Sequence, residues 1–484
     1  MYRLRLMAAR VRALLAHLHP RRLPDTVKKI FARFGMMGVY WHLRAFFLQL
    51  AWGIQPRAIA NTVRWLAACR RDVKTRRRDK RLTVAVDISP LWEPLTGIGW
   101  YLYRLLEHLA DRDDLELRLY GPTLVESGDL PQPVITLPTG PAIHLVTWKV
   151  PRDLSFSWDF MVRCLRALQP RLIAADRNDL LFAPNYFLPP SFRRARGRLV
   201  VTVHDLGFER VPETLRESTR HDLARHLDHT LERATQVLTD TETVRAELLA
   251  SGRGLDPSSI HAVHLGPGPV VIGAGDDDPA HLPEGTPARY GLFVGTLEPR
   301  KDLPTLIAAW RELRATYSND GEPPALVLCG RWGWKTERLE AAVRAGRDEG
   351  WLHTFGYLAD AEVAALYRHA SLVALPSIYE GFGLPVVEAQ ALGIPLAVSD
   401  IPVLREVAGD AAIFAPPGEI PAWTDALKRV LDDDELRADL IARGHARRAH
   451  FDWRRTASAT AAVWMTAAGR SGETYEPNRL AEVS

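Results

Sequence analysis

The chain has 484 residues, enough for two or three domains of ~150 residues each. Hydrophobic residues make up 47% and charged residues 25%, which is the ordinary composition of a globular protein. The three cysteines, Cys69, Cys164 and Cys329, lie far apart, which argues against a disulfide framework and against a zinc site and suits a reducing compartment.

The net charge of +4 hides a strong asymmetry along the chain. Residues 1–81 contain 20 Lys and Arg against 3 Asp and Glu, so they carry +17 while the remainder carries −13. Such a basic extension indicates an anionic partner, either nucleic acid or lipid head groups. The most apolar run, residues 36–54, is interrupted by His42, Arg44 and Gln49, so we expect no transmembrane helix, and the start of the chain lacks the pattern of a secretory signal.

We interpret residues 1–81 as a helical extension that lies on an anionic membrane surface. The protein would then be cytoplasmic and peripheral at the cytoplasmic face of the membrane. The alternative is a helical subdomain that packs on the rest of the chain or forms an oligomer contact, because apolar helix faces usually bury against protein.

Residues 82–270 predict a first domain built from βαβ units. Short apolar runs alternate with longer helical periods, which is typical of a parallel sheet covered by helices. A helix is expected to open at Gly97, where apolar residues recur every three to four positions. The expected strands are Thr83–Ile88, Ile143–Val146, Leu180–Ala183, Leu199–Val203 and Val237–Thr239.

A second domain of the same kind is expected over residues 289–450. Residues 271–288 are rich in Gly, Pro and Asp, which suits a linker, and residues 469–484 form a small, polar and loose tail. The expected strands of this domain are Gly291–Gly295, Ala325–Gly330, Leu372–Pro376, Pro395–Ser399 and Ala412–Ala415. Two such units in series predict two doubly wound α/β domains that face each other.

Ligands of open α/β sheets bind outside the carboxyl ends of the strands, so the residues after each strand are the candidates for chemistry. After the expected strand 372–376, Gly381 and Gly383 precede a helix whose first N–H groups and dipole would hold a phosphate. Glu388, placed in the first turn of that helix, could bind a ribose diol, and Glu380 would lie near a sugar on the phosphate. Each carboxylate alone is more simply a solvated cap, but the combination favours a nucleotide-sugar site.

Three weaker signals accompany this segment. Arg300 and Lys301 follow a strand and could neutralise a diphosphate leaving group, although a charged turn is the simpler explanation. His204 ends another strand and could bind a substrate oxygen, move a proton, or serve only the structure. Gly97 and Gly99 could approach a phosphate, but they do not complete a dinucleotide-binding motif.

We expect no metal site and no cofactor. The acidic runs Asp276–Asp278 and Asp432–Asp434 lie in the linker and before a helix, where they are best explained as solvated faces or caps.

Several segments together resemble glycosyltransferase family 4. Glu380 and Glu388 match the family's E-x7-E signature within the run PSIYEGFGLPVVEAQALGIP. The other segments that carry the resemblance are GTLEPRKDL at Gly295–Leu303, LVLCGRWGW at Leu326–Trp334, TVHDL at Thr202–Leu206, TGIGWYLYRLL at Thr96–Leu106, FAPNYFLPP at Phe182–Pro190, and Phe451–Trp453 at the start of a final helix (residues 451–468) that crosses back to the first domain.

The resemblance implies a GT-B fold, a nucleotide-sugar donor held by the second domain, no essential metal, and retention at the anomeric carbon. It implies that Glu380 contacts the donor sugar and Glu388 the ribose, while Gly383 and Leu384 offer backbone N–H groups. It also implies a front-face attack, in which the leaving diphosphate accepts the acceptor's proton and Glu380 positions the sugar instead of acting as a base.

The same resemblance gives Arg300 and Lys301 the diphosphate, His204 a place at the reacting sugar, and Gly97 and Gly99 the approach of the first domain to the cleft. The sequence departs from the family at Asp302, where Asn or Gly is commoner, and at Trp100, where Arg is usual.

The resemblance is greatest to bacterial mannosyl- and rhamnosyltransferases of surface polysaccharide assembly. We therefore expect a GDP-, dTDP- or UDP-sugar donor carrying a hexose or deoxyhexose, and a glycan or lipid-linked acceptor. The alternatives are a GT-B nucleotide-sugar epimerase and a non-catalytic protein that binds a sugar nucleotide. A nucleic-acid protein is a further alternative because of Arg76–Arg78, but we expect no nucleic-acid partner, since no known module accompanies them.

Overall fold

The computed structural model describes residues 81–92, 95, 97–121, 136–146, 173, 176–189, 192–193, 195, 197–272, 281–317 and 322–470. The expectations for residues 1–80, for the acidic run 276–278 and for the tail beyond residue 470 lie outside the described residues. Within the described part of the chain, no helix has both the length and the apolar character needed to cross a membrane.

The first domain contains a seven-stranded parallel sheet in the order β3-β2-β1-β4-β5-β6-β7. Its strands are β1 (Leu82–Asp87), β2 (Leu115–Tyr120), β3 (Ile143–Leu145), β4 (Leu180–Ala183), β5 (Arg198–Val203), β6 (Gln236–Thr239) and β7 (Ile260–Ala262). The sequence interpretation missed β2 and β7. β2 is fully buried although it contains Glu116 and Arg118, which form an ion pair of 2.8 Å and so hide the apolar character of the strand.

The second domain contains a six-stranded parallel sheet in the order β10-β9-β8-β11-β12-β13. Its strands are β8 (Tyr290–Val294), β9 (Ala325–Cys329), β10 (Leu352–Phe355), β11 (Leu372–Leu375), β12 (Leu396–Ser399) and β13 (Ile413–Ala415). Only β10 was missed, because its sequence LHTF has no continuous apolar run. Two parallel sheets in series confirm the predicted fold class.

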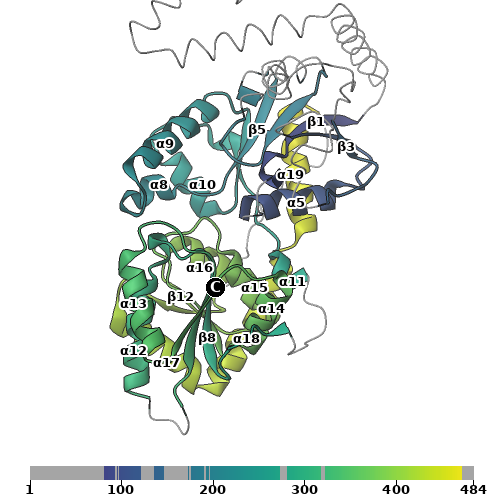
Figure 1. Ribbon diagram of the computed structural model, residues 1–484. Helices are drawn as coiled ribbons and strands as arrows, with labels where there is room; N and C mark the ends of the chain where they lie inside the picture. The colour runs from purple at the N-terminus through teal and green to yellow at the C-terminus, as the bar shows by residue number, and fades with distance from the viewer. Residues whose placement is uncertain are drawn as a thin grey trace, which may run out of the picture.

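Helices cover both sheets. In the first domain they are α5 (Gly97–Leu109), α8 (Gly207–Arg210), α9 (Glu217–Leu231) and α10 (Glu242–Leu249). The short helix α11 (Pro269–Ile272), in the segment that leads out of the first domain, packs on helices of the second domain (Figure 1). In the second domain they are α12 (Leu303–Ala315), α13 (Glu337–Asp348), α14 (Asp360–His369), α15 (Leu384–Leu392), α16 (Pro402–Ala408), α17 (Ile420–Asp432) and α18 (Asp434–Arg447).

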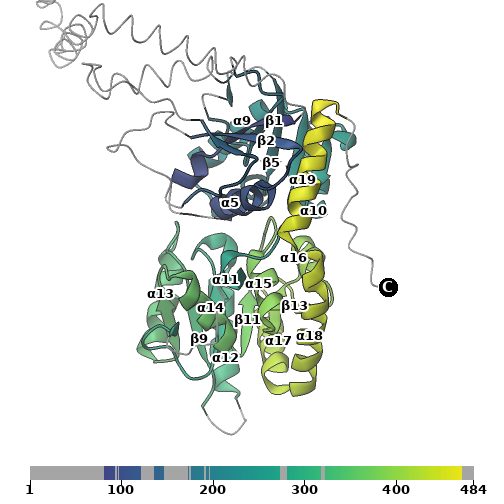
Figure 2. The same ribbon diagram turned by 90° about the vertical axis from the view of Figure 1, so that its right-hand side faces the viewer.

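The final helix, α19 (Trp453–Ala468), returns to the first domain as the sequence predicts. Asp452 caps it by accepting a hydrogen bond from the N–H group of Arg454, and Trp464 packs on Phe182 of β4 with ring centroids 4.9 Å apart. The helix lies along the first domain in both ribbon views (Figure 1 and Figure 2). The chain therefore connects the two domains twice, once through residues near 270 and once before α19.

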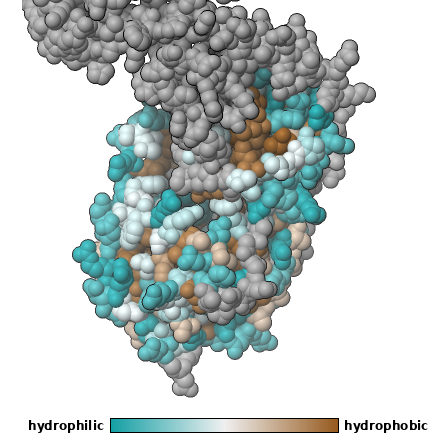
Figure 3. Space-filling model, turned by 45° about the vertical axis from the view of Figure 1, so that its right-hand side comes forward, coloured by the Kyte–Doolittle hydropathy of each residue, from teal (hydrophilic) through white to brown (hydrophobic). Residues whose placement is uncertain are grey.

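The two domains lie one above the other with the carboxyl ends of their central strands facing each other (Figure 1). His204 follows β5, Gly381 follows β11, and a Cβ atom on Gly381 would lie only 2.1 Å from the carbonyl oxygen of His204. On the side of the molecule that Figure 3 shows, the largest visible hydrophobic area lies in the first domain, above the boundary between the domains. The fold thus brings the expected site residues of both domains to one boundary.

Candidate active site

Glu380 forms the centre of a buried charge cluster at the domain boundary. Its Oε1 accepts hydrogen bonds from Lys301 Nζ at 2.5 Å and Ser377 Oγ at 2.6 Å, and its Oε2 accepts one from Arg300 Nη1 at 2.9 Å. Neighbouring strands bring these residues together: the cations follow β8, Glu380 follows β11, and β8 pairs with β11. The structure therefore unites Arg300, Lys301 and Glu380 as the sequence predicts.

The cluster holds as many carboxylates as cations. Arg300 also pairs with Glu298 at 2.8 Å, so the two positive side chains are shared between two acidic ones. Burial opposes ionisation of Glu380, but Lys301 and Arg300 outweigh it and lower the pKa of Glu380 to about 2. A bound diphosphate would compete with Glu380 for both cations, so the carboxylate and the phosphate oxygens must share them.

The turn that carries these cations contains a left-handed residue. Asp302 adopts φ 43° and ψ 41° between the 3-10 turn Pro299–Lys301 and helix α12. Gly and Asn tolerate this conformation best, and Asp tolerates it better than most other residues. The departure from the family's usual residue at this position therefore preserves the backbone of the turn.

Glu388 lies one turn further into its helix than expected. Helix α15 begins at Leu384, because its N-cap Gly383 takes a left-handed conformation with φ 92°. Glu388 is therefore the fifth residue of the helix, and the prediction that it lies in the first turn is wrong. Tyr367 Oη donates a hydrogen bond of 2.7 Å to its Oε2. Burial raises the pKa of Glu388 to about 7.

Glu388 also reaches the segment that leads from the first domain to the second. A Cβ atom on Gly268 would lie 1.8 Å from Glu388 Oε1, so any larger residue there would displace this carboxyl. Gly383 and Leu384 form the start of the same helix, as the phosphate-binding hypothesis requires, and a Cβ atom on Gly383 would lie 2.9 Å from Leu404.

His204 lies at the boundary, but both of its ring nitrogens are engaged. Nδ1 lies 2.7 Å from Asp240 Oδ2 and Nε2 lies 2.8 Å from the carbonyl oxygen of Pro184. Burial lowers the pKa of His204, but Asp240 outweighs it and raises the pKa above the usual value. A protonated ring that donates at both nitrogens fits this arrangement, which favours a positioning role over proton transfer.

Gly97 and Gly99 open helix α5 as expected, but their surroundings differ. A Cβ atom on Gly99 would lie 2.8 Å from Leu95 and 3.3 Å from the carbonyl oxygen of Pro90, so this glycine serves packing within the first domain. A Cβ atom on Gly97 would meet nothing within 4 Å. Trp100, the second departure from the family, packs edge-on against Tyr103 with ring centroids 5.9 Å apart.

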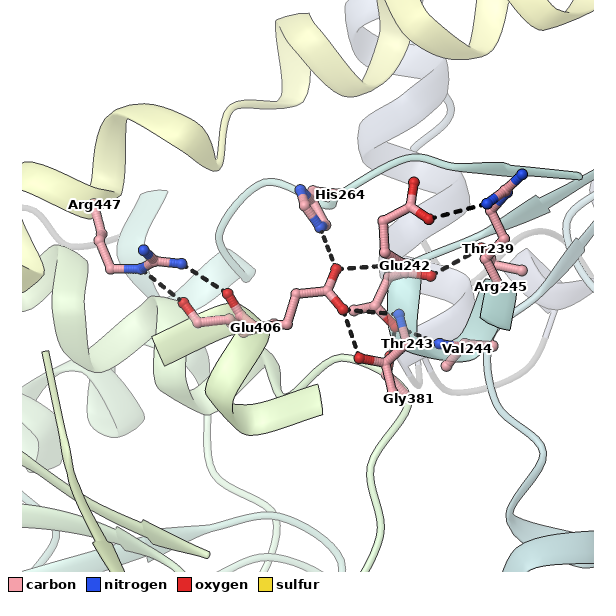
Figure 4. Close-up of polar contacts among 11 residues, drawn as sticks. Thr239, Glu242, Thr243, Val244, Arg245, His264, Gly381, Glu406 and Arg447 are labelled. Atoms are coloured by element: carbon pink, nitrogen blue, oxygen red, sulfur yellow. Dashed lines mark hydrogen bonds and ion pairs between the residues drawn. The ribbon is translucent and has the colours of Figure 1, made fainter. Parts of the chain in front are cut away.

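A carboxylate of the second domain clamps a helix of the first (Figure 4). Glu406, in α16, accepts hydrogen bonds from the backbone N–H groups of Glu242 at 2.7 Å and Thr243 at 2.8 Å, the first two residues of α10. The Thr243 hydroxyl donates to the same carboxylate at 2.7 Å, and His264 Nε2 lies 2.7 Å from it. The negative charge therefore sits where the N–H groups and the dipole of α10 favour it.

The backbone of the helix that carries Glu406 is itself held by an arginine of the second domain. Arg447 donates hydrogen bonds to the carbonyl oxygens of Glu406 at 2.7 Å and Val407 at 3.1 Å, near the end of α16 (Figure 4). Burial opposes ionisation of Glu406, but the contacts with His264 and Thr243 hold its pKa below the usual value. The sequence interpretation missed Glu406, because nothing in one sequence marks a residue whose partners lie in another domain.

Ser377, Glu298 and Tyr379 were also missed as site residues. All three lie within the segments that carry the family resemblance, which is the signal that could have found them. Their hydrogen-bond and ion-pair partners follow only from the fold. Among the described residues, no group of three or more His, Cys, Asp or Glu side chains has the arrangement of a metal site.

Comparison with known proteins accounts for both domains. Residues 276–447 match the family described as glycosyl transferases group 1, and residues 96–266 match the glycosyl transferase 4-like domain. The chain is 30% identical over 386 residues to O-antigen chain mannosyltransferase B of Escherichia coli, an alignment that covers 75% of this chain and 94% of the relative.

Solved structures share the fold at lower identity. Sucrose-phosphate synthase of Thermosynechococcus elongatus superposes with a TM-score of 0.59 and 19% identity over 80% of this chain and 99% of its own. HepE of Anabaena, in complex with UDP and glucose, superposes with a TM-score of 0.58 and 17% identity over 79% of this chain and 98% of its own. The family matches, the mannosyltransferase relative and the two facing sheets agree, and the chain belongs to the family 4-like glycosyltransferases of GT-B fold.

Proposed function

We propose that the protein transfers a mannose- or rhamnose-like hexose or deoxyhexose from a nucleotide sugar to a glycan or lipid-linked acceptor in polysaccharide biosynthesis, with retention and without a metal. The buried cluster of Glu380, Lys301 and Arg300 at the domain boundary carries the proposal. The O-antigen mannosyltransferase relative supports mannose as the first sugar to test.

The donor would lie along the carboxyl edge of the second sheet. Its ribose would bind Glu388, its diphosphate would lie between the start of α15 and the cations Arg300 and Lys301, and its sugar would contact Glu380. The acceptor would enter from the first domain, on the side of His204.

The reaction that fits these residues is a front-face displacement. The bond between the anomeric carbon and the diphosphate oxygen breaks, and its electron pair leaves with the diphosphate, whose growing charge Arg300 and Lys301 stabilise. The acceptor oxygen bonds to the same face of the anomeric carbon, and its proton passes to the departing diphosphate. Glu380 holds the sugar and the cations in place during this exchange.

The test is incubation with GDP-mannose, dTDP-rhamnose and UDP-glucose in parallel, with and without a glycan or lipid-linked acceptor, followed by release of nucleoside diphosphate. Acceptor-dependent release, with a product whose anomeric proton shows the donor's configuration by NMR, supports the proposal. Interconversion of the donor without acceptor identifies an epimerase instead, and binding without turnover identifies a non-catalytic binding protein.

Chelation is expected to leave the activity intact. Arg300 and Lys301 would supply the positive charge that a metal would otherwise bring to the diphosphate. We therefore expect the same initial rate before and after treatment with EDTA. Activity that EDTA abolishes and Mn²⁺ or Mg²⁺ restores would contradict the proposed mechanism.

Donor affinity is expected to rise with pH around neutrality. Because the pKa of Glu388 is raised to about 7, its carboxyl ionises in this range, and an ionised carboxylate accepts hydrogen bonds from both ribose hydroxyls. Calorimetric titration between pH ~6 and ~8 should show the rise, and Glu388→Gln should remove it and weaken binding by ~1–3 kcal/mol at the upper pH. Glu349→Gln, at a half-exposed ion pair, is the control. An unchanged pH profile in Glu388→Gln would exclude Glu388 as the source.

The raised pKa of Glu388 also affects stability: the free energy of unfolding should fall as the pH rises, whereas donor affinity should increase. The folded state keeps a proton on Glu388 that the unfolded chain loses near pH 4.5, so this group's contribution to the free energy of unfolding declines as the pH rises from 4.5 to about 7.

We further propose that residues 1–81 hold the enzyme on an anionic membrane surface, where a lipid-linked acceptor would also lie. Their charge of +17 would be attracted with roughly 1 kcal/mol for each basic residue near the surface. The full chain is expected to float with anionic vesicles at low salt, and a chain that starts at Arg81 is expected not to. Equal flotation of both chains, or of neither, would exclude the extension as the anchor.

A further inference from the structure

We propose that Tyr379 is a positioning residue, through which the first domain sets the geometry of Glu380 and Arg300, so that the sugar side of the site is complete only when the two domains are closed. The inference rests on the proposed transferase function and adds the residue through which the first domain acts on the donor site.

The side-chain hydroxyl of Tyr379 makes its hydrogen bonds with residues of the first domain. Its Oη accepts a hydrogen bond of 3.0 Å from the backbone N–H group of Leu206 and donates one of 2.8 Å to Glu247 Oε2. Its ring packs against Gly207, where a Cβ atom would lie 3.4 Å from the ring, and the residue is only 7% exposed. A residue of the second domain is thus inserted into the first.

The backbone of Tyr379 belongs to the active site. Its carbonyl oxygen accepts a hydrogen bond of 2.9 Å from Arg300 Nη1, the same nitrogen that donates to Glu380 Oε2 at 2.9 Å. Glu380 is the next residue along the chain. A shift of Tyr379 therefore moves both the sugar-side carboxylate and one of the two diphosphate-side cations.

The residue on the other side of Glu380 is also held by the first domain. Thr241 Oγ1 donates a hydrogen bond of 3.1 Å to the carbonyl oxygen of Gly381, while it caps α10 by accepting one of 3.2 Å from Val244. The Cα of Gly381 lies against the carbonyl group of His204, where a side chain could not fit. Glu380 thus lies between two residues that are both anchored to the opposite domain.

The hydroxyl of Tyr379 stays protonated around neutral pH. Burial, and then the carboxylates of Glu247 and Asp205, raise the pKa of Tyr379 well above its usual value. The hydroxyl is therefore a permanent donor to Glu247 and a permanent acceptor for Leu206. Its loss would leave a buried N–H group without this partner and would weaken the closed arrangement.

The experiment compares Tyr379→Phe with Tyr290→Phe in the full chain. Tyr290 is a matched control, because its buried Oη donates to the carbonyl oxygen of Leu366 at 2.8 Å within the second domain, at the opposite end of β8 from the site. We expect Tyr379→Phe to lower kcat at least ~10-fold while the Kd for GDP or UDP changes less than ~3-fold, because Lys301 and the start of α15 would still hold the diphosphate when Arg300 shifts. Tyr290→Phe should keep its kcat.

Two further measurements separate positioning from general damage. Glu247→Gln keeps an oxygen that accepts from Tyr379 and should retain most of the activity, whereas Glu247→Leu should resemble Tyr379→Phe. Small-angle scattering, which needs no substrate, should show a larger radius of gyration for Tyr379→Phe than for the wild type and for Tyr290→Phe.

Each outcome decides the inference. Unchanged kcat and radius of gyration in Tyr379→Phe would overturn it, and so would a loss confined to the Kd for GDP or UDP, which would make Tyr379 part of the donor site only. If the wild type transfers no sugar, the proposed function fails, but the scattering result still tests the coupling between the domains.

Discussion

Replacing Glu380 by alanine is expected to lower kcat by ~10²–10³-fold, the range seen when one preorganised polar group at a reacting centre is removed. The carboxylate holds Lys301 and Arg300 at 2.5 and 2.9 Å, so its loss removes one partner of each cation and the contact proposed for the donor sugar. Initial rates at saturating donor and acceptor measure the effect.

The same substitution should destabilise the fold, because removing one partner from a buried ion pair costs ~3–5 kcal/mol. Its pH dependence is specific. With a pKa lowered from 4.5 to about 2, Glu380 stabilises the wild type above pH 4.5, and this contribution disappears as the pH falls toward 2. Denaturant unfolding at several pH values should show a smaller acid-induced loss in Glu380→Ala than in the wild type.

Glu380→Gln and Arg311→Ala separate the possible causes. The glutamine keeps the size of the side chain and one acceptor oxygen, so it should fold better than the alanine variant while remaining slow. Arg311→Ala breaks an exposed ion pair with Glu349. It should leave kcat unchanged and should change the free energy of unfolding by no more than ~1 kcal/mol. Wild-type kcat in Glu380→Ala would remove Glu380 from the mechanism.

The sequence predicts the position of this cluster well, because each member follows an apolar strand and parallel strands end at a common edge. Glu380, Arg300 and Lys301 could be assigned to one site by that rule together with the family resemblance. Their mutual neutralisation could not be predicted, since it depends on side-chain distances of a few ångströms and not on spacing along the chain.

The errors have the same physical origin. β2 was missed because Glu116 and Arg118 pair inside the first domain, and a buried ion pair reads as a polar segment in the sequence. His204 was placed correctly at the end of β5, but its contacts with Asp240 and Pro184 come from neighbouring strands and change its expected role. Gly99 opens α5 as expected, but its packing against Pro90 and Leu95, which lie before its own helix, could not be predicted from the sequence.

Replacing Glu406 by alanine is expected to open the protein and to reduce transfer by at least ~10-fold. Its carboxylate accepts from the N–H groups of Glu242 and Thr243, from the Thr243 hydroxyl, and contacts His264 Nε2, all at 2.7–2.8 Å (Figure 4). Hydrogen bonds to a charged group contribute ~1.5–3 kcal/mol each, so their combined loss is large enough to shift the balance between closed and open domains. None of these residues contacts the proposed donor, so the Kd for GDP or UDP should change little.

Scattering and kinetics on the same samples decide this prediction. The radius of gyration should increase and kcat should fall in Glu406→Ala. Glu406→Gln should give an intermediate result, because its oxygen still accepts from α10 while its NH₂ group faces N–H donors. Asp439→Asn breaks only an exposed ion pair with Arg443 on α18 of the same domain and is the matched control. If Glu406→Ala keeps the wild-type radius of gyration and kcat, the contacts at Tyr379 and Gly381 hold the domains closed without the clamp; if it opens but remains fully active, closure does not limit the reaction.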